Sequence, residues 1–304
     1  MFKVAYAAVH DEKNKYLGNR FNLYNLLSSK RIINNTERET GTCSASLWGN
    51  INYNNISVPG NIPAQENSSG NSFIKHENIN SRKTDCLNEY WPLLPAAKKE
   101  IDTIGQIFSK KNIEVVFTED NIATEDEFLK QDGNAPCIIH IATHGYYKPV
   151  VRKMISEAGM DDRYFIQTQM LDCGLVLAGA NHSKTCISNS GEGYDGILTA
   201  YEISQLDLSK TKLVTLSACE TALGNIDNTE GVMGLQRAFS MAGVKNILMS
   251  LWKVPDETTV EFMAFFYKEL MKGNDCYTAL YYARKCMQQR HPAYFWAGFI
   301  LTGP

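Results

Sequence analysis

The stretch KLVTLSACETALG, residues 212–224, decides the fold, because an apolar run of strand length ends there at Cys219 and passes into small and polar residues. Further unbroken apolar runs lie at residues 137–142, 174–178, 246–252 and 296–301. Such runs are typical of strands in a sheet that is covered on both faces. Helical patterns separate most of them, at about residues 230–242, 256–271 and 275–289. The alternation predicts a three-layer α/β sandwich with a mainly parallel central sheet.

The segment upstream of these runs continues the pattern. LPAAKKEIDTIGQIFSKK predicts a helix that presents Ile101, Ile104 and Phe108 on one face, and residues 113–117 predict a short strand. Thr124, with Glu127 three residues later, predicts a capping box. Residues 54–84 are rich in Asn, Ser and Gly, so we expect a flexible polar insertion in a single domain spanning residues 1–304.

Composition and charge exclude several classes of function. The 304 residues include 30 basic and 33 acidic side chains, so there is no electrostatic case for nucleic acid or an anionic membrane surface as a partner. No stretch has the length of a membrane span, and the apolar run near the N-terminus is too short for a signal peptide. Eight cysteines occur without a CxxC pair, which favours reduced thiols and a cytoplasmic location.

Two of the expected strands end in reactive groups. His144 and Gly145 follow the run at 137–142, and Cys219 follows the run at 212–217. If these strands are parallel neighbours, the imidazole and the thiol meet at one edge of the sheet. The histidine can then assist thiolate formation, and the Gly145 amide can approach a developing oxyanion. The alternative is structural: a buried thiol and a histidine of the core.

Four blocks of the sequence carry a family resemblance. IIHIATHGYY, DGILTAYEISQLDLSKTKLVTLSACETALG, EGVMGLQRAFSMAGVKNILMSLWKVPDETT and PAYFWAGFILTG resemble successive parts of the CHAT domain, a caspase-like family of clan CD cysteine peptidases. The similarity extends upstream through LLPAAKKEIDTIGQIF and, more weakly, YLGNRFNLYNLLSSKRII and SLWGNINYN. It implies a caspase-like sandwich with a catalytic dyad of His144 and Cys219, and an oxyanion site formed by the backbone amides of Gly145 and Cys219.

The sequence also departs from this family. Many relatives carry tetratricopeptide repeats before the domain, and this sequence has no repeat of that length, so regulation by such repeats in cis is not expected. Its first twenty residues match the usual opening of the domain poorly. The resemblance as a whole implies an endopeptidase that acts on a protein substrate. The alternative function is that of a catalytically silent scaffold that acts through its surface.

By the same resemblance, the position two residues before the nucleophile influences selectivity on the acyl side of the cut. Metacaspase-like relatives with basic specificity have an acidic residue there, whereas this sequence has Ser217. A hydroxyl cannot offset the cost of desolvating a cation, so an uncharged substrate side chain is expected unless Asp172 or Asp195 reaches the cleft. Trp252 ends the following strand and is a further candidate for the wall of the cleft.

Other patterns in the sequence give weaker evidence of function. GEGYDG at residues 191–196 fits GxGxxG formally but does not follow a strand, which leaves nucleotide binding as a third hypothesis. His140 and His144 have a metal-binding spacing only on a helix, and they lie on a strand pattern, so we expect neither metal nor cofactor. The segments 147–172 and 189–196 border the expected cleft and hold little apolar content. We therefore expect a partner or ligand to order them and activate the chain.

Overall fold

The computed structural model describes residues 8–9, 15–16, 43–54, 90–147, 170–182, 195–217 and 228–303. Nearly all of the expected insertion at 54–84 and most of the segments 147–172 and 189–196 lie outside these residues. The expected single domain over residues 1–304 therefore stays a prediction.

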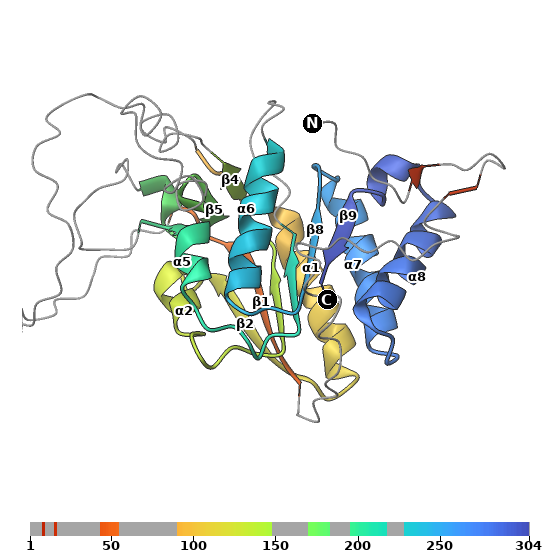
Figure 1. The fold of residues 1–304 in the computed structure, drawn as a ribbon, viewed down its shortest axis with the longest axis horizontal. Helices are drawn as coiled ribbons and strands as arrows, with labels where there is room; N and C mark the ends of the chain where they lie inside the picture. Colours follow the sequence, from red (N-terminus) through yellow and green to blue (C-terminus); the bar gives the residue numbers. More distant parts are fainter. Residues whose placement is uncertain are drawn as a thin grey trace, which may run out of the picture.

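A six-stranded sheet forms the centre of the fold, in the order β2-β1-β3-β7-β8-β9 (Figure 1). Each neighbouring pair is parallel except β8 and β9. This confirms the prediction of an α/β fold with a mainly parallel central sheet. The strands are β1 (Ser44–Ile51), β2 (Glu114–Asp120), β3 (Ile138–Ile141), β7 (Leu213–Leu216), β8 (Asn246–Ser250) and β9 (Phe299–Thr302).

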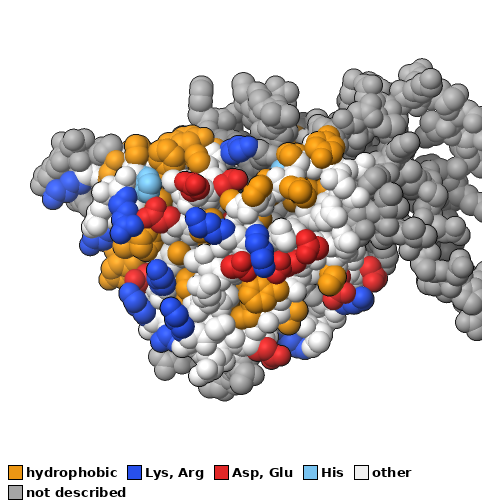
Figure 2. All heavy atoms as spheres, turned by 180° about the vertical axis from the view of Figure 1, so that it is seen from behind, with side chains coloured by type: hydrophobic (Ala, Val, Ile, Leu, Met, Phe, Trp, Pro, Cys, Tyr) orange, Lys and Arg blue, Asp and Glu red, His pale blue; other side chains and the backbone are white. Residues whose placement is uncertain are grey.

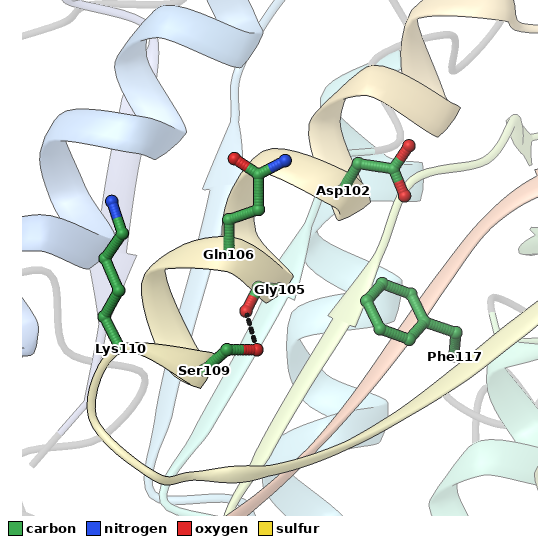
Figure 3. Close-up of a pocket in the computed structure, with 6 residues that line it drawn as sticks. All are labelled: Asp102, Gly105, Gln106, Ser109, Lys110 and Phe117. Carbon is green, nitrogen blue, oxygen red and sulfur yellow. Dashed lines mark hydrogen bonds between the residues drawn. The ribbon is translucent and has the colours of Figure 1, made fainter.

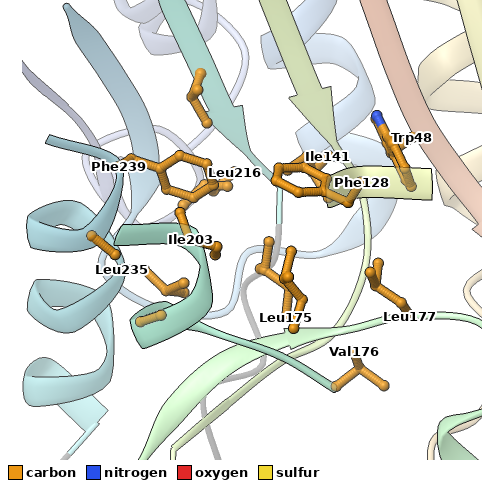
Figure 4. Close-up of a cluster of buried hydrophobic side chains, with 14 of the residues drawn as sticks. Trp48, Phe128, Ile141, Leu175, Val176, Leu177, Ile203, Leu216, Leu235 and Phe239 are labelled. Carbon is orange, nitrogen blue, oxygen red and sulfur yellow. The ribbon is translucent and has the colours of Figure 1, made fainter. Parts of the chain in front are cut away.

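Helices cover both faces of this sheet, as Figure 1 shows. One layer contains α1 (Pro95–Ser109), α7 (Asp256–Leu270) and α8 (Cys276–Gln288). The other contains α2 (Glu125–Leu129), α5 (Ala200–Ser204) and α6 (Asn228–Met241). In Figure 4, Phe239 of α6 and Phe128 of α2 lie against Leu216 and Ile141 of the sheet. Because side chains alternate along a strand, Leu213 and Thr215 face the α1 layer instead.

The pattern of unbroken apolar runs does not predict strand β1, although this strand lies between β2 and β3 and is almost entirely buried. Its sequence, SASLWGNI, interrupts the apolar run with Ser, Gly and Asn. Gly49 is needed there, because a Cβ atom would lie 3.0 Å from Cγ2 of Ile101 and 3.2 Å from the carbonyl oxygen of Ala97. The missing side chain lets α1 pack closely on the sheet.

A second sheet corrects part of the strand prediction. The run at 174–178, which we expected in the parallel sheet, instead contributes β5 (Cys173–Val176) to a three-stranded antiparallel sheet. Its neighbours are β4 (Gly145–Tyr147) and β6 (Ile197–Thr199). All four residues of β5 are buried, so its sequence has the same apolar character as a central strand, and a short apolar run cannot reveal its direction.

The predicted helix start at Thr124 is half right. The Thr124 hydroxyl accepts a hydrogen bond from the backbone N–H of Glu127 at 3.2 Å, but the Glu127 carboxylate pairs with Lys130 at 2.8 Å. The reciprocal bond of a capping box therefore does not form there. It forms at α5, where Thr199 and Glu202 exchange both bonds.

Cys43 and Cys137 form a disulfide, which corrects the expectation that the cysteines are reduced. The two residues precede the parallel neighbours β1 and β3, so their Cα atoms lie 5.2 Å apart although 94 positions separate them in sequence. Spacing along the chain gives no sign of this pairing. Cys276 and Cys286 are free thiols, and Cys173 is buried.

No described helix is both long and apolar enough to cross a bilayer. Figure 2 shows acidic and basic side chains lying close together near the middle of one face of the molecule.

Glu125, the first residue of α2, is buried together with part of the β6 segment. Its Oε1 atom accepts hydrogen bonds from the backbone N–H groups of Gly196 at 2.5 Å and Ile197 at 3.2 Å. Burial, followed by the charges of Asp195 and Glu202, raises the pKa of Glu125 to about 8. This carboxyl group therefore stays protonated near neutral pH and anchors the start of β6 to α2.

Replacing Cys43 and Cys137 together by serine should lower the free energy of unfolding by about 2–4 kcal/mol, because the disulfide restricts the unfolded chain. Urea unfolding measures the change. Cys286→Ser, at a free thiol, is the control and should alter stability by less than about 1 kcal/mol. Equal stability of the double variant and the wild type would contradict this role for the disulfide.

Glu125→Gln should remove a dependence of stability on pH. The folded-state pKa of about 8 exceeds the ordinary value of 4.5, so between these values the folded chain binds more protons than the unfolded chain and loses stability as the pH rises. The amide cannot titrate. Unfolding at about pH 5 and about pH 8 should therefore show the variant gaining at least about 1 kcal/mol over the wild type at the higher pH.

Glu127→Gln, two residues further along α2 and solvent-accessible, is the matched control and should keep the wild-type pH dependence. The same slope in Glu125→Gln as in the wild type would show that Glu125 is not the group that titrates.

Candidate active site

A cleft of about 590 Å³ opens at the carboxyl edge of the central sheet. Its volume is within the range of small-ligand sites, roughly 300–1,000 Å³. The start of α1, the end of β3, Ser217 beyond β7 and the start of α7 contribute to its walls. Because β3 and β7 are parallel neighbours, the residues that follow them reach the same edge. His144 and Ser217 therefore line one cleft.

His144 is fully buried between two aromatic rings. The ring centroids of Tyr53 and Trp91 lie 5.1 Å and 5.3 Å from that of the imidazole. The Nε2 atom of His144 lies 2.7 Å from the carbonyl oxygen of Pro92. A carbonyl oxygen only accepts hydrogen bonds, so Nε2 carries a proton and Nδ1 is the basic nitrogen of the neutral ring.

The surroundings of His144 favour its neutral form. Burial is the largest effect and lowers the pKa of the imidazole below 6.5; the bond to Pro92 opposes it, Lys253 lowers the pKa further, and Asp256 raises it. Above the ordinary histidine pKa the ring is therefore uncharged and can accept a proton at Nδ1.

The segment that carries the Pro92 carbonyl is itself fixed by Asn181. The side chain of Asn181 accepts a hydrogen bond from the Trp91 N–H at 2.7 Å and donates one to the Trp91 carbonyl oxygen at 2.9 Å. Its own N–H donates to the carbonyl oxygen of Tyr53 at 2.9 Å. Asn181 thus connects Tyr53 with Trp91, the two aromatic neighbours of His144. Trp91 also directly precedes Pro92, whose carbonyl oxygen accepts the bond from His144.

The backbone next to His144 directs the Gly145 amide away from β5. The N–H of Val176 donates to the carbonyl oxygen of His144 at 2.9 Å, which makes these two residues a hydrogen-bonded pair. In an antiparallel ladder the next pair, Gly145 with Leu175, is then a non-hydrogen-bonded pair. No other described strand pairs with β4, so the ladder does not use the Gly145 N–H.

A buried polar network lies beneath the cleft, between the sheet and the layer of α1 and α7. The Ser217 hydroxyl donates to Oε2 of Glu100 at 3.1 Å. Oε1 of Glu100 lies 3.0 Å from Nε2 of His140, but the contact does not have the geometry of a hydrogen bond. Nδ1 of His140 lies 3.1 Å from the Tyr267 hydroxyl, which donates to Thr215 at 2.8 Å.

The other predicted site residues are distributed as follows. Cys219 lies outside the described residues. Asp172 is buried near Cys173, and Asp195 accepts a bond from the N–H of Ile197 near Glu125, so neither lines the described cleft. Trp252 does not line it either.

Trp252 instead packs beside the cleft. Its ring lies on Gly298, stacks on Tyr294 at 6.1 Å and donates a hydrogen bond to the carbonyl oxygen of Tyr294. Because Tyr294 lines the cleft, Trp252 supports the wall from behind.

The described cysteines offer no competing nucleophile in the cleft. Burial raises the pKa of the Cys173 and Cys276 thiols to about 12, so both stay protonated. Neither Cys173, Cys276 nor Cys286 lines the cleft. The described part of the chain also contains no cluster of three or more His, Cys, Asp or Glu residues suited to a metal.

Another hollow lies toward the opposite end of α1, with a volume of about 500 Å³. Figure 3 shows it between Phe117, the α1 residues Asp102, Gly105, Gln106 and Ser109, and Lys110 directly after the helix. Its lining holds neither an imidazole nor a thiol, so it does not have the chemistry of the cleft.

Two site residues were missed by the sequence reasoning. Glu100 lies on the buried face of α1 with Ala97, Ile101 and Ile104, and a charge within an apolar stripe is the signal that marks it. Asn181 has no comparable signal, because its role depends on contacts with residues 90 positions or more distant in sequence.

Parts of this chain are similar to known proteins. Tetratricopeptide repeat protein 28 of Homo sapiens is 27% identical over 223 residues, and its counterpart in Mus musculus is 28% identical over 222 residues. Each alignment covers 70% of this chain but only 8% and 9% of those proteins. The solved structure of the Arg specific cysteine proteinase gingipain R matches 68% of this chain and 41% of its own, with a TM-score of 0.40 and 10% identity.

The model of the CHAT domain matches residues 1–304, which is the whole sequence. The chain therefore belongs to the CHAT domain family.

Proposed function

We propose that the chain is a cysteine endopeptidase in which Cys219 is the nucleophile and His144 the general base. The observation that carries the proposal is the hydrogen bond from His144 Nε2 to the Pro92 carbonyl oxygen, at 2.7 Å. This bond gives a buried histidine at the edge of the cleft a defined basic nitrogen. Acid–base catalysis requires such a nitrogen, whereas a histidine with a purely structural role does not need one.

The position of Cys219 in the sequence supports its role. It follows Ser217 by two residues, and consecutive Cα atoms are about 3.8 Å apart, so the two Cα atoms lie within about 7.6 Å of each other on any path. Ser217 lines the same cleft as His144. The chain can therefore bring a thiol to this cleft without any longer-range rearrangement.

The reaction follows from these groups. His144 Nδ1 takes the thiol proton, and Cys219 Sγ attacks the peptide carbonyl carbon while the backbone amides of Gly145 and Cys219 stabilise the oxyanion. The C–N bond breaks, and His144 gives its proton to the leaving amine. Water, deprotonated by His144, then attacks the thioester, and its C–S bond breaks to restore the thiol and release the acid.

Two other functions compete with this proposal. A silent scaffold needs no defined tautomer at His144, so the geometry favours the enzyme. Nucleotide binding rested on the glycines at 191–196, of which only Gly196 is described. Gly196 has a structural reason to be glycine: its φ is +80°, and a Cβ atom would lie 2.4 Å from the backbone nitrogen of Ala180.

We further propose a cytoplasmic location and activation by a partner protein or ligand. The human relative that matches this chain is named for tetratricopeptide repeats, and repeat arrays commonly present extended binding surfaces. An array on another chain would be one such partner. In a reducing compartment, activity should persist when the Cys43–Cys137 disulfide is reduced.

Cys219→Ala and His144→Gln should each lower peptide cleavage by at least about a thousandfold, because each removes a group that acts at the reacting atoms. Glutamine is preferred to alanine at position 144, since His144 is fully buried and alanine would leave a cavity. Turnover of a protein substrate found by co-expression with neighbouring gene products provides the assay. Cys286→Ser, at a free thiol away from the cleft, should retain wild-type turnover.

Thermal unfolding of the same variants separates catalysis from folding. Cleavage by either Cys219→Ala or His144→Gln at the wild-type rate would contradict the mechanism.

The purified chain alone should turn over substrate at least about tenfold more slowly than the chain with its activating partner, because loop closure completes many active sites. Rates measured with the purified chain and in lysate of the native host compare the two states. Full turnover by the purified chain would rule out the need for a partner.

A further inference from the structure

The cleft contains a buried acid that the peptidase mechanism does not use. Glu100 is only 4% exposed and lies on the apolar face of α1, yet it lines the cleft together with His144 and Ser217. A carboxylate at such a position is costly unless hydrogen-bond donors surround it. An apolar residue at position 100 would serve helix packing better, so the acid requires another explanation.

The described residues leave the hydrogen-bonding capacity of Glu100 incomplete. An ionised carboxylate has about four acceptor positions. Oε2 accepts one bond, from the Ser217 hydroxyl at 3.1 Å. Oε1 has no hydrogen-bond donor among the described residues, since its contact with His140 at 3.0 Å lacks the required geometry. Oε1 is itself buried against His140, so the remaining acceptor position of Oε2, beside Ser217 in the lining of the cleft, is the one left for a donor from a ligand.

The described lining as a whole has the same sign as Glu100. It carries three carboxylates and one ammonium group, at Glu100, Asp256, Glu257 and Lys253. With His144 neutral, the net charge of these groups is −2. A cleft of this charge lowers the energy of a cationic group and raises that of an anionic one.

We propose that Glu100 is the specificity-determining residue of the cleft and selects a lysine or arginine side chain on the acyl side of the cut. The inference rests on the peptidase function proposed above. It replaces the expectation of an uncharged side chain, which depended on neither Asp172 nor Asp195 reaching the cleft and did not consider Glu100. Helix α1 supplies that acid, and the Ser217 hydroxyl holds it in place.

Three peptidyl acyloxymethyl ketones that differ only in a P1 residue of Lys, Leu or Glu test the inference on the full chain. The rate of Cys219 modification is followed by mass spectrometry. The Lys probe should react at least about tenfold faster than the Leu probe, as expected for a largely desolvated charge pair, and the Glu probe should be the slowest. A Leu or Glu probe that reacts as fast as the Lys probe would overturn the inference and leave the peptidase proposal standing.

Glu100→Gln removes the charge with little change of shape and should lower the Lys-to-Leu rate ratio by at least about tenfold. Asp102→Asn is the matched control, on the same helix but 44% exposed and paired with Lys98, and should keep the wild-type ratio. An unchanged ratio in Glu100→Gln would overturn the role of Glu100. The wild-type rates decide the question of specificity even if that variant does not fold, and modification of Cys219 by none of the probes would overturn the peptidase proposal itself.

Discussion

The hydrogen bond from His144 Nε2 to the Pro92 carbonyl oxygen is the interaction on which the chemistry of the site depends. It places the proton on one nitrogen and leaves the other as the base. The bond requires that residues 90–92 be held against the end of β3, and Asn181 does this through both backbone groups of Trp91. Tyr53 and Trp91 then enclose the ring and lower its pKa by excluding water.

The parallel sheet supplies the second constraint. Strands β3 and β7 pair directly, with His140 opposite Thr215, so the residues after each strand reach a common edge. The same register directs His140, Thr215 and Ser217 toward α1 and α7, where Glu100 and Tyr267 complete a buried polar network. The close packing of α1 on the sheet, which Gly49 permits, brings Glu100 to the floor of the cleft. Fold and site therefore depend on the same contacts.

Much of this arrangement could be predicted from the sequence, for identifiable reasons. Unbroken apolar runs revealed β3, β7 and β8, and the residues at their carboxyl ends indicated His144. Strand β1 was missed because Ser, Gly and Asn interrupt it, and the direction of β5 was wrong because a buried antiparallel strand has the same composition as a parallel one. The disulfide, Asn181 and the pairing of Glu100 with Ser217 depend on contacts between residues far apart in sequence, which no local pattern encodes.

A crystal structure of the full chain inactivated by a peptidyl acyloxymethyl ketone with lysine at P1 tests the central claim most directly. The account predicts a thioether at Cys219 Sγ, the inhibitor carbonyl oxygen near the Gly145 amide, His144 Nε2 still bonded to Pro92, and the lysine ammonium group next to Glu100. An adduct on another residue, or a His144 ring turned away from Pro92 with Nδ1 directed away from the sulfur, would contradict it.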